Sequence, residues 1–86
     1  MWQILFTPRA RKDLLFLEKE TTKRVVSKIE KSAEKPELLF ERLVGFPYYK
    51  LRAGDYRIIA VLDFDKKIIG IRRIGNRENI YKKIQA

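Results

Sequence analysis

The sequence predicts an α+β fold with the order β-α-α-β-β-β, in which an N-terminal helical hairpin packs on a small antiparallel sheet and a short helical tail follows. Three features predict it: a helix-start signal after the first apolar run, three alternating runs after residue 48, and a turn signal at Gly54-Asp55. Because 86 residues can bury only one core, we expect a single domain over residues 1–86.

The N-terminal segment predicts a strand that leads directly into a helix. Residues 2–7 (WQILFT) are typical of a strand, and the threonine at their end is a good N-cap before Pro8, a favoured first helical residue. Apolar spacing then predicts a helix to about Glu18, with Leu15 and Phe16 widening its apolar face.

A second helix is expected to begin at Thr21 or Thr22, with an apolar stripe at Val25, Val26, Ile29 and Ala33. Proline cannot continue a helix interior, so Pro36 should end it. Residues 37–45 (ELLFERLVG) fit either a helical turn or an irregular link, and their structure is left open.

The C-terminal half predicts a three-stranded antiparallel meander. Its strands are YYKLRA (48–53), YRIIAVL (56–62) and IIGIRRI (68–74), which are rich in β-branched and aromatic residues. The tail, 77–84, has helical spacing, but a helix this short is stable only when it is docked.

The Gly54-Asp55 turn fixes the register of the first hairpin, because glycine suits the first central position of a two-residue type II′ turn. Ala53 should then oppose Tyr56, and Arg52 should oppose Arg57. One face then carries Leu51, Ala53, Tyr56, Ile58, Ala60 and Leu62, which we assign to the core beneath the helices. The other face carries Lys50, Arg52 and Arg57.

Cations directly opposite each other on a sheet are destabilising, so folding alone does not favour this arrangement. A phosphate-binding site does, because guanidinium groups match phosphate oxygens and stay charged. The alternative is a solvated sheet face that happens to be cationic. Arg72 and Arg73, adjacent on the last strand, should point to opposite faces, and Tyr81 could pack in the core or stack on a base.

The composition narrows the function. The net charge is +9, and residues 48–86 hold ten cations against four anions, which indicates a polyanionic partner or, alternatively, a charged surface of the kind found in thermophiles. There is no cysteine and no histidine, so thiol chemistry and the commonest metal ligand are excluded. No apolar run could span a bilayer, and we expect a cytoplasmic protein with no membrane partner.

Two motifs resemble the RelE/ParE toxins: G-x-x-Y-Y-K-L-R-A-G-D-Y-R-I-I at Gly45 to Ile59, and I-G-N-R-x-x-I-Y at Ile74 to Tyr81. The order of elements is also similar, so the resemblance covers nearly the whole chain. Asn76 stands where many relatives have histidine, which bears on proton transfer more than on the class of reaction.

The resemblance to RelE-type members implies the toxin of a toxin–antitoxin pair: a ribosome-dependent endoribonuclease that cleaves messenger RNA in the A site by attack of the 2′-hydroxyl, without metal or cofactor. It implies a RelB-like antitoxin, the ribosome and mRNA as partners. The catalytic residues that it implies are Lys50, Arg52, Arg57, Arg77 and Tyr81. The further RNA-binding residues expected here are Arg72, Arg73, Lys82 and Lys83.

Two other functions remain open at this stage. The ParE branch, which acts on DNA gyrase, shares the fold but usually lacks this full residue set. A non-catalytic RNA-binding module would use the same cations for binding alone.

Overall fold

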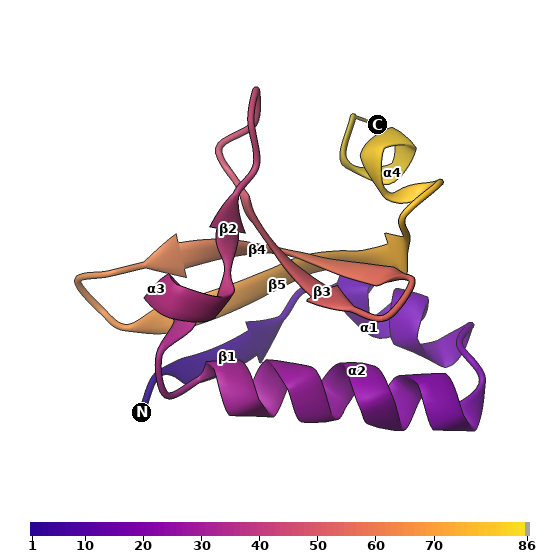
Figure 1. Ribbon diagram of the computed structural model, residues 1–86, viewed down its shortest axis with the longest axis horizontal. Helices are drawn as coiled ribbons and strands as arrows, with labels where there is room; N and C mark the ends of the chain where they lie inside the picture. The colour runs from indigo at the N-terminus through magenta and orange to yellow at the C-terminus, as the bar shows by residue number, and fades with distance from the viewer. Residues whose placement is uncertain (86) are drawn as a thin grey trace.

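The computed structural model describes residues 1–85, one residue short of the end of the expected domain. Its elements confirm the α+β class, with a five-stranded sheet and four helices (Figure 1). In chain order they are β1 (Gln3–Phe6), α1 (Pro8–Leu15), α2 (Lys19–Ser32), α3 (Pro36–Leu39), β2 (Glu41–Arg42), β3 (Tyr49–Ala53), β4 (Tyr56–Asp63), β5 (Ile68–Asn76) and α4 (Ile80–Gln85).

The sheet has the order β1-β5-β4-β3-β2. The expected antiparallel meander is confirmed in β3, β4 and β5, but the sheet as a whole is mixed, because β1 joins its edge parallel to β5. The segment left open, 37–45, contains most of α3 and the two-residue strand β2, which pairs with the start of β3.

The first helix begins as expected. The Thr7 hydroxyl accepts a hydrogen bond from the backbone N–H of Ala10 at 3.1 Å and donates one to the carbonyl of Arg72 at 3.0 Å, so the cap also attaches the helix to β5. The helix ends at Leu15 rather than Glu18. The prediction that Leu15 and Phe16 widen the apolar face is therefore wrong: Leu15 is the last residue of the helix and Phe16 its C-cap, and they are 83% and 88% exposed.

The second helix starts at Lys19, before the threonines that were expected to begin it, and it ends at Ser32. Pro36 does not end this helix, because it is the first residue of α3, a position where its missing N–H costs nothing. Val25 and Ile29 are fully buried, as the apolar stripe predicts.

The two faces of the sheet are covered differently (Figure 1). The face beneath α1 and α2 holds the main core, which includes the buried residues Val25, Ile29, Leu51, Ile58, Ala60, Ile69, Ile71 and Ile74. On the opposite face, Ile59 packs with Ile80 of α4 and with Leu43 of the segment between β2 and β3. This second cluster docks the short helix α4, which could not be stable alone.

Gly75 permits this docking. A Cβ at this position would lie 3.1 Å from Lys83 Nζ and 3.3 Å from Ile80 Cδ1, so α4 sits directly on the strand. A Cβ at Gly70 of the same strand would meet only the carbonyl of Val61, at 3.7 Å. The two glycines therefore provide a matched pair for testing the docking of α4.

We expect Gly75→Ala to weaken the docking of α4 by about 1 kcal/mol, because the new methyl group crowds Ile80 and Lys83. Amide hydrogen exchange in residues 80–85 should then be about fivefold faster, while exchange in the sheet is unchanged. Gly70→Ala is the control and should leave the exchange rate of residues 80–85 unchanged. Equal exchange in the two variants would show that α4 does not need the space above Gly75.

Candidate functional site

The β3–β4 hairpin turns at Gly54-Asp55 with the predicted register. Gly54 has φ +62°, and Asp55 has a negative φ, as a type II′ turn requires. The pairing brings Arg52 opposite Arg57 and Lys50 opposite Ile59, which confirms the predicted register. Since Ile59 belongs to the second cluster, the three cations project from the face opposite α1 and α2.

Arg57 is held at the turn by its own hairpin. Its Nη1 donates hydrogen bonds to the carbonyls of Gly54 at 2.9 Å and Tyr56 at 3.0 Å. The guanidinium is thus positioned by backbone groups, and no carboxylate of residues 1–85 forms an ion pair with it. Such a group is preorganised to meet an anion.

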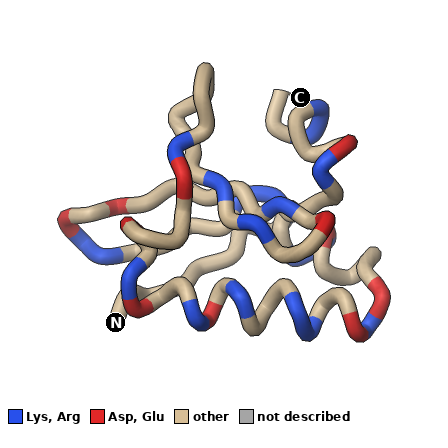
Figure 2. Tube along the Cα trace, viewed as in Figure 1, with Lys and Arg blue, Asp and Glu red and all other residues tan. Residues whose placement is uncertain are grey.

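Arg77 joins the same end of the sheet. Its backbone N–H donates to the carbonyl of Asp55 at 2.9 Å, and its side chain lines a cavity of about 300 Å³ with Asp55, Tyr56, Asn76 and Glu78. We call Lys50, Arg52, Arg57 and Arg77 the hairpin cluster. Among residues 1–85 no member of this cluster lies within 4 Å of a carboxylate oxygen as an ion pair. Figure 2 shows the run of cations along β3.

Tyr81 lies on α4, next to the buried Ile80, and its side chain is 40% exposed. The alternative in which Tyr81 packs in the core is therefore wrong. Lys82 is exposed on the same helix, whereas Lys83 is half-buried and turns toward β5.

Arg72 and Arg73 do not point to opposite faces, because a β-bulge interrupts the alternation. Ile59 pairs with Arg73 and Ala60 pairs with Ile71, which leaves Arg72 without a partner on β4. The Arg72 guanidinium lies 5.2 Å from the centre of the Tyr48 ring, and both arginines line one cavity of about 360 Å³ with Tyr48 and Lys83.

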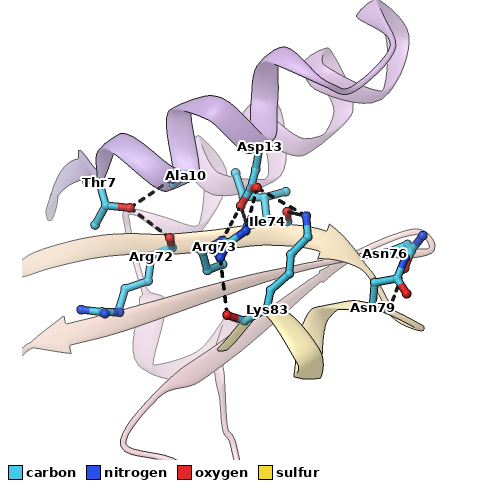
Figure 3. Close-up of polar contacts among 9 residues, drawn as sticks. All are labelled: Thr7, Ala10, Asp13, Arg72, Arg73, Ile74, Asn76, Asn79 and Lys83. Atoms are coloured by element: carbon cyan, nitrogen blue, oxygen red, sulfur yellow. Dashed lines mark hydrogen bonds and ion pairs between the residues drawn. The ribbon is translucent and has the colours of Figure 1, made fainter. Parts of the chain in front are cut away.

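A buried carboxylate that sequence reasoning missed connects α1, β5 and α4. Figure 3 shows Asp13 of α1 at the centre of this network. Its Oδ2 accepts from Arg73 Nε at 2.9 Å and from the backbone N–H of Ile74 at 2.8 Å. Its Oδ1 accepts from Lys83 Nζ at 3.4 Å and from Arg73 Nη2 at 3.2 Å. Lys83 also donates to the Ile74 carbonyl at 3.1 Å.

The charge state of Asp13 follows from these contacts. Burial alone would raise its pKa, but the hydrogen bonds from Arg73 and Ile74 and the positive charges of Lys83 and Arg73 outweigh burial and lower the pKa below its usual value of 3.8. Asp13 is therefore ionised at neutral pH. The signal in the sequence is its position, because Ala10, Asp13, Leu14 and Leu17 share one helical face.

The nine predicted site residues thus fall into separate groups. Within residues 1–85 the four cations of the hairpin cluster form no ion pair; Arg52, Arg57 and Arg77 lie at the turn end of the sheet, and Lys50 lies two residues before Arg52 on β3. Arg73 and Lys83 are both bound to Asp13, while Arg72 stacks on Tyr48. Tyr81 and Lys82 are exposed on α4.

Residues 1–85 contain no group of three or more acidic side chains arranged to hold a metal ion. None of the helices in this part of the chain has the length and apolar character needed to cross a membrane.

We expect Asp13→Asn to lower the free energy of unfolding at pH 7 by about 2 to 3 kcal/mol, because it leaves two partly buried cations without their anion. Since the folded pKa lies below 3.8, the ionised carboxylate stabilises the fold above that pH, and this contribution is lost as the pH falls through the folded value. Urea unfolding of both proteins from pH 7 to pH 2 should show the difference narrowing below pH 3.8. Asp65→Asn, on an exposed loop, should match the wild type.

The comparisons with known proteins agree with this architecture. The sequence profile of the ParE toxin of the type II toxin–antitoxin system parDE matches residues 4–81. The structure is similar to that of the RelBE2 toxin–antitoxin complex from Mycobacterium tuberculosis, with a TM-score of 0.79 and 24% identity over 88% of this chain and 98% of that one. No curated protein matches the sequence.

Two further structures are similar at slightly higher identity. The intact Escherichia coli RelBE complex gives a TM-score of 0.74 and 25% identity over 88% of this chain and 96% of that one. The RelB–RelE complex from Methanococcus jannaschii gives a TM-score of 0.71 and 28% identity over 92% of this chain and 96% of that one. With the profile match spanning almost the whole sequence, the chain belongs to the ParE toxin family of type II toxin–antitoxin systems, within the RelE/ParE superfamily.

Proposed function

We propose that this toxin is a metal-independent endoribonuclease that cleaves messenger RNA in the ribosomal A site, and that the hairpin cluster is its catalytic surface. The observation that carries the proposal is the Arg52–Arg57 pair: two cations directly opposite each other, with no carboxylate partner within the described chain. Repulsion between the two cations lowers the stability of the fold by up to about 1 kcal/mol. A bound phosphate would turn this repulsion into a net attraction between the cations and the anion.

RNA supplies its own nucleophile, so the enzyme must orient the 2′-hydroxyl, accept its proton and stabilise the charge that develops on phosphorus. Arg57, already fixed by two backbone carbonyls, and Arg77 at the same turn are suited to stabilise this charge. Lys50 is our candidate for the base, because it is the one amine in the hairpin cluster and a guanidinium hardly gives up its proton. Arg52 would hold a neighbouring phosphate.

The remaining predicted residues would bind or position the RNA. Tyr81, exposed on α4, would stack on a base or orient the 2′-hydroxyl, and Arg72 and Lys82 would contact the backbone. Arg73 and Lys83 would act indirectly, because their contacts with Asp13 hold α4 beside the strand that pairs with Arg57. The expected products are a 2′,3′-cyclic phosphate or 3′-phosphate and a 5′-hydroxyl end.

Charge stabilisation and positioning are the main catalytic resources of this surface, and the chain has no histidine for general acid–base catalysis. Such an enzyme would be slow on RNA that it must orient alone. The ribosome would supply the missing orientation by presenting the message in a fixed conformation. This proposal places the reaction in the cytoplasm, where translation takes place.

A RelB-like antitoxin is the proposed partner. The structures similar to this chain include RelB–RelE complexes from several organisms. An acidic, amphipathic antitoxin segment would match the positive charge of the hairpin cluster and the apolar contacts of α4 with Ile59 and Leu43.

One observation favours a second candidate function. The family profile that matches the chain is named for ParE, and the ParE branch acts on DNA gyrase. In that case the hairpin cluster would be a docking surface, and Lys50, Arg52 and Tyr81 would be individually dispensable.

A purified translation system distinguishes the two functions. With translating ribosomes, we expect messenger fragments with new 5′-hydroxyl ends at codon-spaced positions, at EDTA levels that leave ribosomes intact, and activity that falls steeply with salt. Arg57→Ala and Arg77→Ala should each lower the cleavage rate by about 10²- to 10³-fold, since each removes a group that would stabilise the transition state. Their thermal unfolding should stay unchanged or rise slightly, because repulsion is relieved.

Arg11→Ala, on an exposed part of α1, is the matched control and should cleave like the wild type. If messages stay intact while supercoiling is inhibited and gyrase–DNA complexes accumulate, the protein acts on DNA gyrase and the endoribonuclease proposal is wrong. Binding of RNA without cleavage of either target would instead indicate a binding module.

For the partner, we expect a small acidic chain encoded beside this gene to copurify on coexpression. Binding should change the hydrogen exchange of residues 80–85, since the antitoxin would compete with α4 for Ile59 and Leu43. An adjacent gene product that does not bind, with a free protein that is harmless to cells, would contradict this proposal.

A further inference from the structure

A second cationic surface lies on the face of α2 that meets the β3–β4 turn. Arg24, Ser27, Lys28 and Lys31 are spaced three and four residues apart, so they share one face of the helix. Together with Arg52 of β3 and the turn after it, they line a cavity of about 310 Å³, which we call the α2 groove. Figure 2 marks the Lys and Arg positions along α2 in blue.

The α2 groove follows an edge of the sheet that is left open. The strand β2 pairs only with Tyr49 and Lys50, so the rest of β3 has no strand on its outer side among the described residues. In a two-residue hairpin the backbone N–H and carbonyl of Arg52 point to this outer side. The Arg24 guanidinium closes one end of the groove, 3.4 Å from where a Cβ of Gly54 would lie.

The α2 groove is positively charged throughout. Its lining holds four cations and no acidic residue. In residues 1–85 the ion pairs are those of Asp13 with Arg73 and Lys83, so none of the four groove cations is neutralised by a carboxylate. A neighbouring hollow of about 110 Å³ shares Lys28 and Arg52 with the groove and also includes Lys50 and the acidic residue Glu41, and it joins the groove to the hairpin cluster.

We infer that the α2 groove binds the phosphodiester backbone of double-helical RNA. Surfaces that hold single strands combine cations with aromatic side chains on which bases stack, and the α2 groove has no aromatic residue in its lining. Double-helical RNA hides its bases and is recognised by its shape, its phosphates and its 2′-hydroxyls. The lining also has no large apolar side chain that could anchor a peptide, since Ala53 is its one apolar residue.

This inference deepens the proposed function, and it rests on it in identifying the helix as ribosomal RNA. The toxin would hold a structured RNA with α2 while the hairpin cluster, reached through Arg52 and Lys50, acts on the single-stranded message. The two surfaces would have different roles. The α2 groove would provide affinity for the ribosome, and the hairpin cluster would catalyse cleavage of the message.

The test uses a triple variant, Arg24→Gln, Lys28→Gln and Lys31→Gln, which spares the proposed catalytic residues. Glutamine has nearly the same helix propensity as lysine and arginine, so α2 should remain folded, which circular dichroism can check. The control carries Lys19→Gln, Lys35→Gln and Lys66→Gln. These three exposed lysines lie outside the groove, and their removal lowers the net charge by the same amount.

Binding of each protein to a short RNA duplex is measured across a range of salt concentrations. Each phosphate contact in a DNA duplex contributes about 0.9 to the slope of log affinity against log salt, so losing three contacts should reduce the slope by about 2 to 3 in an RNA duplex. Affinity at low salt should fall at least about tenfold, and the control should fall much less. Cosedimentation with ribosomes should likewise fall strongly in the triple variant and much less in the control.

The cleavage assay separates this inference from the proposed function. The triple variant should raise KM for ribosomes and leave kcat within about twofold, because it removes binding that is equal in the ground and transition states. If the wild type cuts no message, the proposed function is wrong while the duplex and ribosome measurements still decide the inference.

Three results would overturn the inference. The first is equal duplex affinity and equal salt slope in the triple variant and the control. The second is a wild-type preference for the single strand over the duplex that the triple variant abolishes. The third is unchanged RNA binding combined with lost affinity for the acidic antitoxin, which would make the α2 groove a protein-binding surface.

Discussion

The Asp13 carboxylate is the group on which the arrangement of α1, β5 and α4 depends. It accepts hydrogen bonds from the backbone of β5 and from side chains of β5 and α4, although it belongs to a helix on the opposite side of the sheet. Past the end of β1, no strand of the described chain lies beside the edge of β5, and Asp13 takes the place of one by accepting a hydrogen bond from the N–H of Ile74. It thereby fixes α4 beside Arg57 without using the charge of any member of the hairpin cluster.

The same arrangement explains why the rest of the surface stays so positive. Asp13 is the acid that pairs with cations in the described chain, and both of its partners lie away from the β3–β4 turn. The other acids form no ion pair within residues 1–85, including Asp55 and Glu78, which line the same cavity as Arg77, and Glu41, which pairs in register with Lys50. Within residues 1–85, ion pairs therefore neutralise the cations that hold β5 and α4 together, whereas the cations of the hairpin cluster have no ion-pair partner.

Much of the fold could be predicted from local signals. The Thr7 cap, the Gly54-Asp55 register and the core face of the meander each depend on residues close in sequence. The bulge at Arg72 could not, because strict alternation gives no sign of where one strand inserts an extra residue. The helical spacing of Arg24, Lys28 and Lys31 is visible in the sequence. The strand beside which they lie could not be predicted, because it depends on how α2 packs on the sheet. The position of Asp13 on the apolar face of its helix indicates burial, but its partners on β5 and α4 are about 60 to 70 residues away and could not be predicted from local signals.

The short strand β2 has a consequence for how this protein behaves in concentrated solution. Beyond Lys50 the outer side of β3 is an open sheet edge, and such edges template pairing with another copy of the same chain. Here that edge lies among Arg52, Arg24 and Lys28, so a second copy approaching in the same way would bring like charges together. The cations beside β3 therefore also act as a barrier to self-association, one that high salt would screen and polyanions would remove.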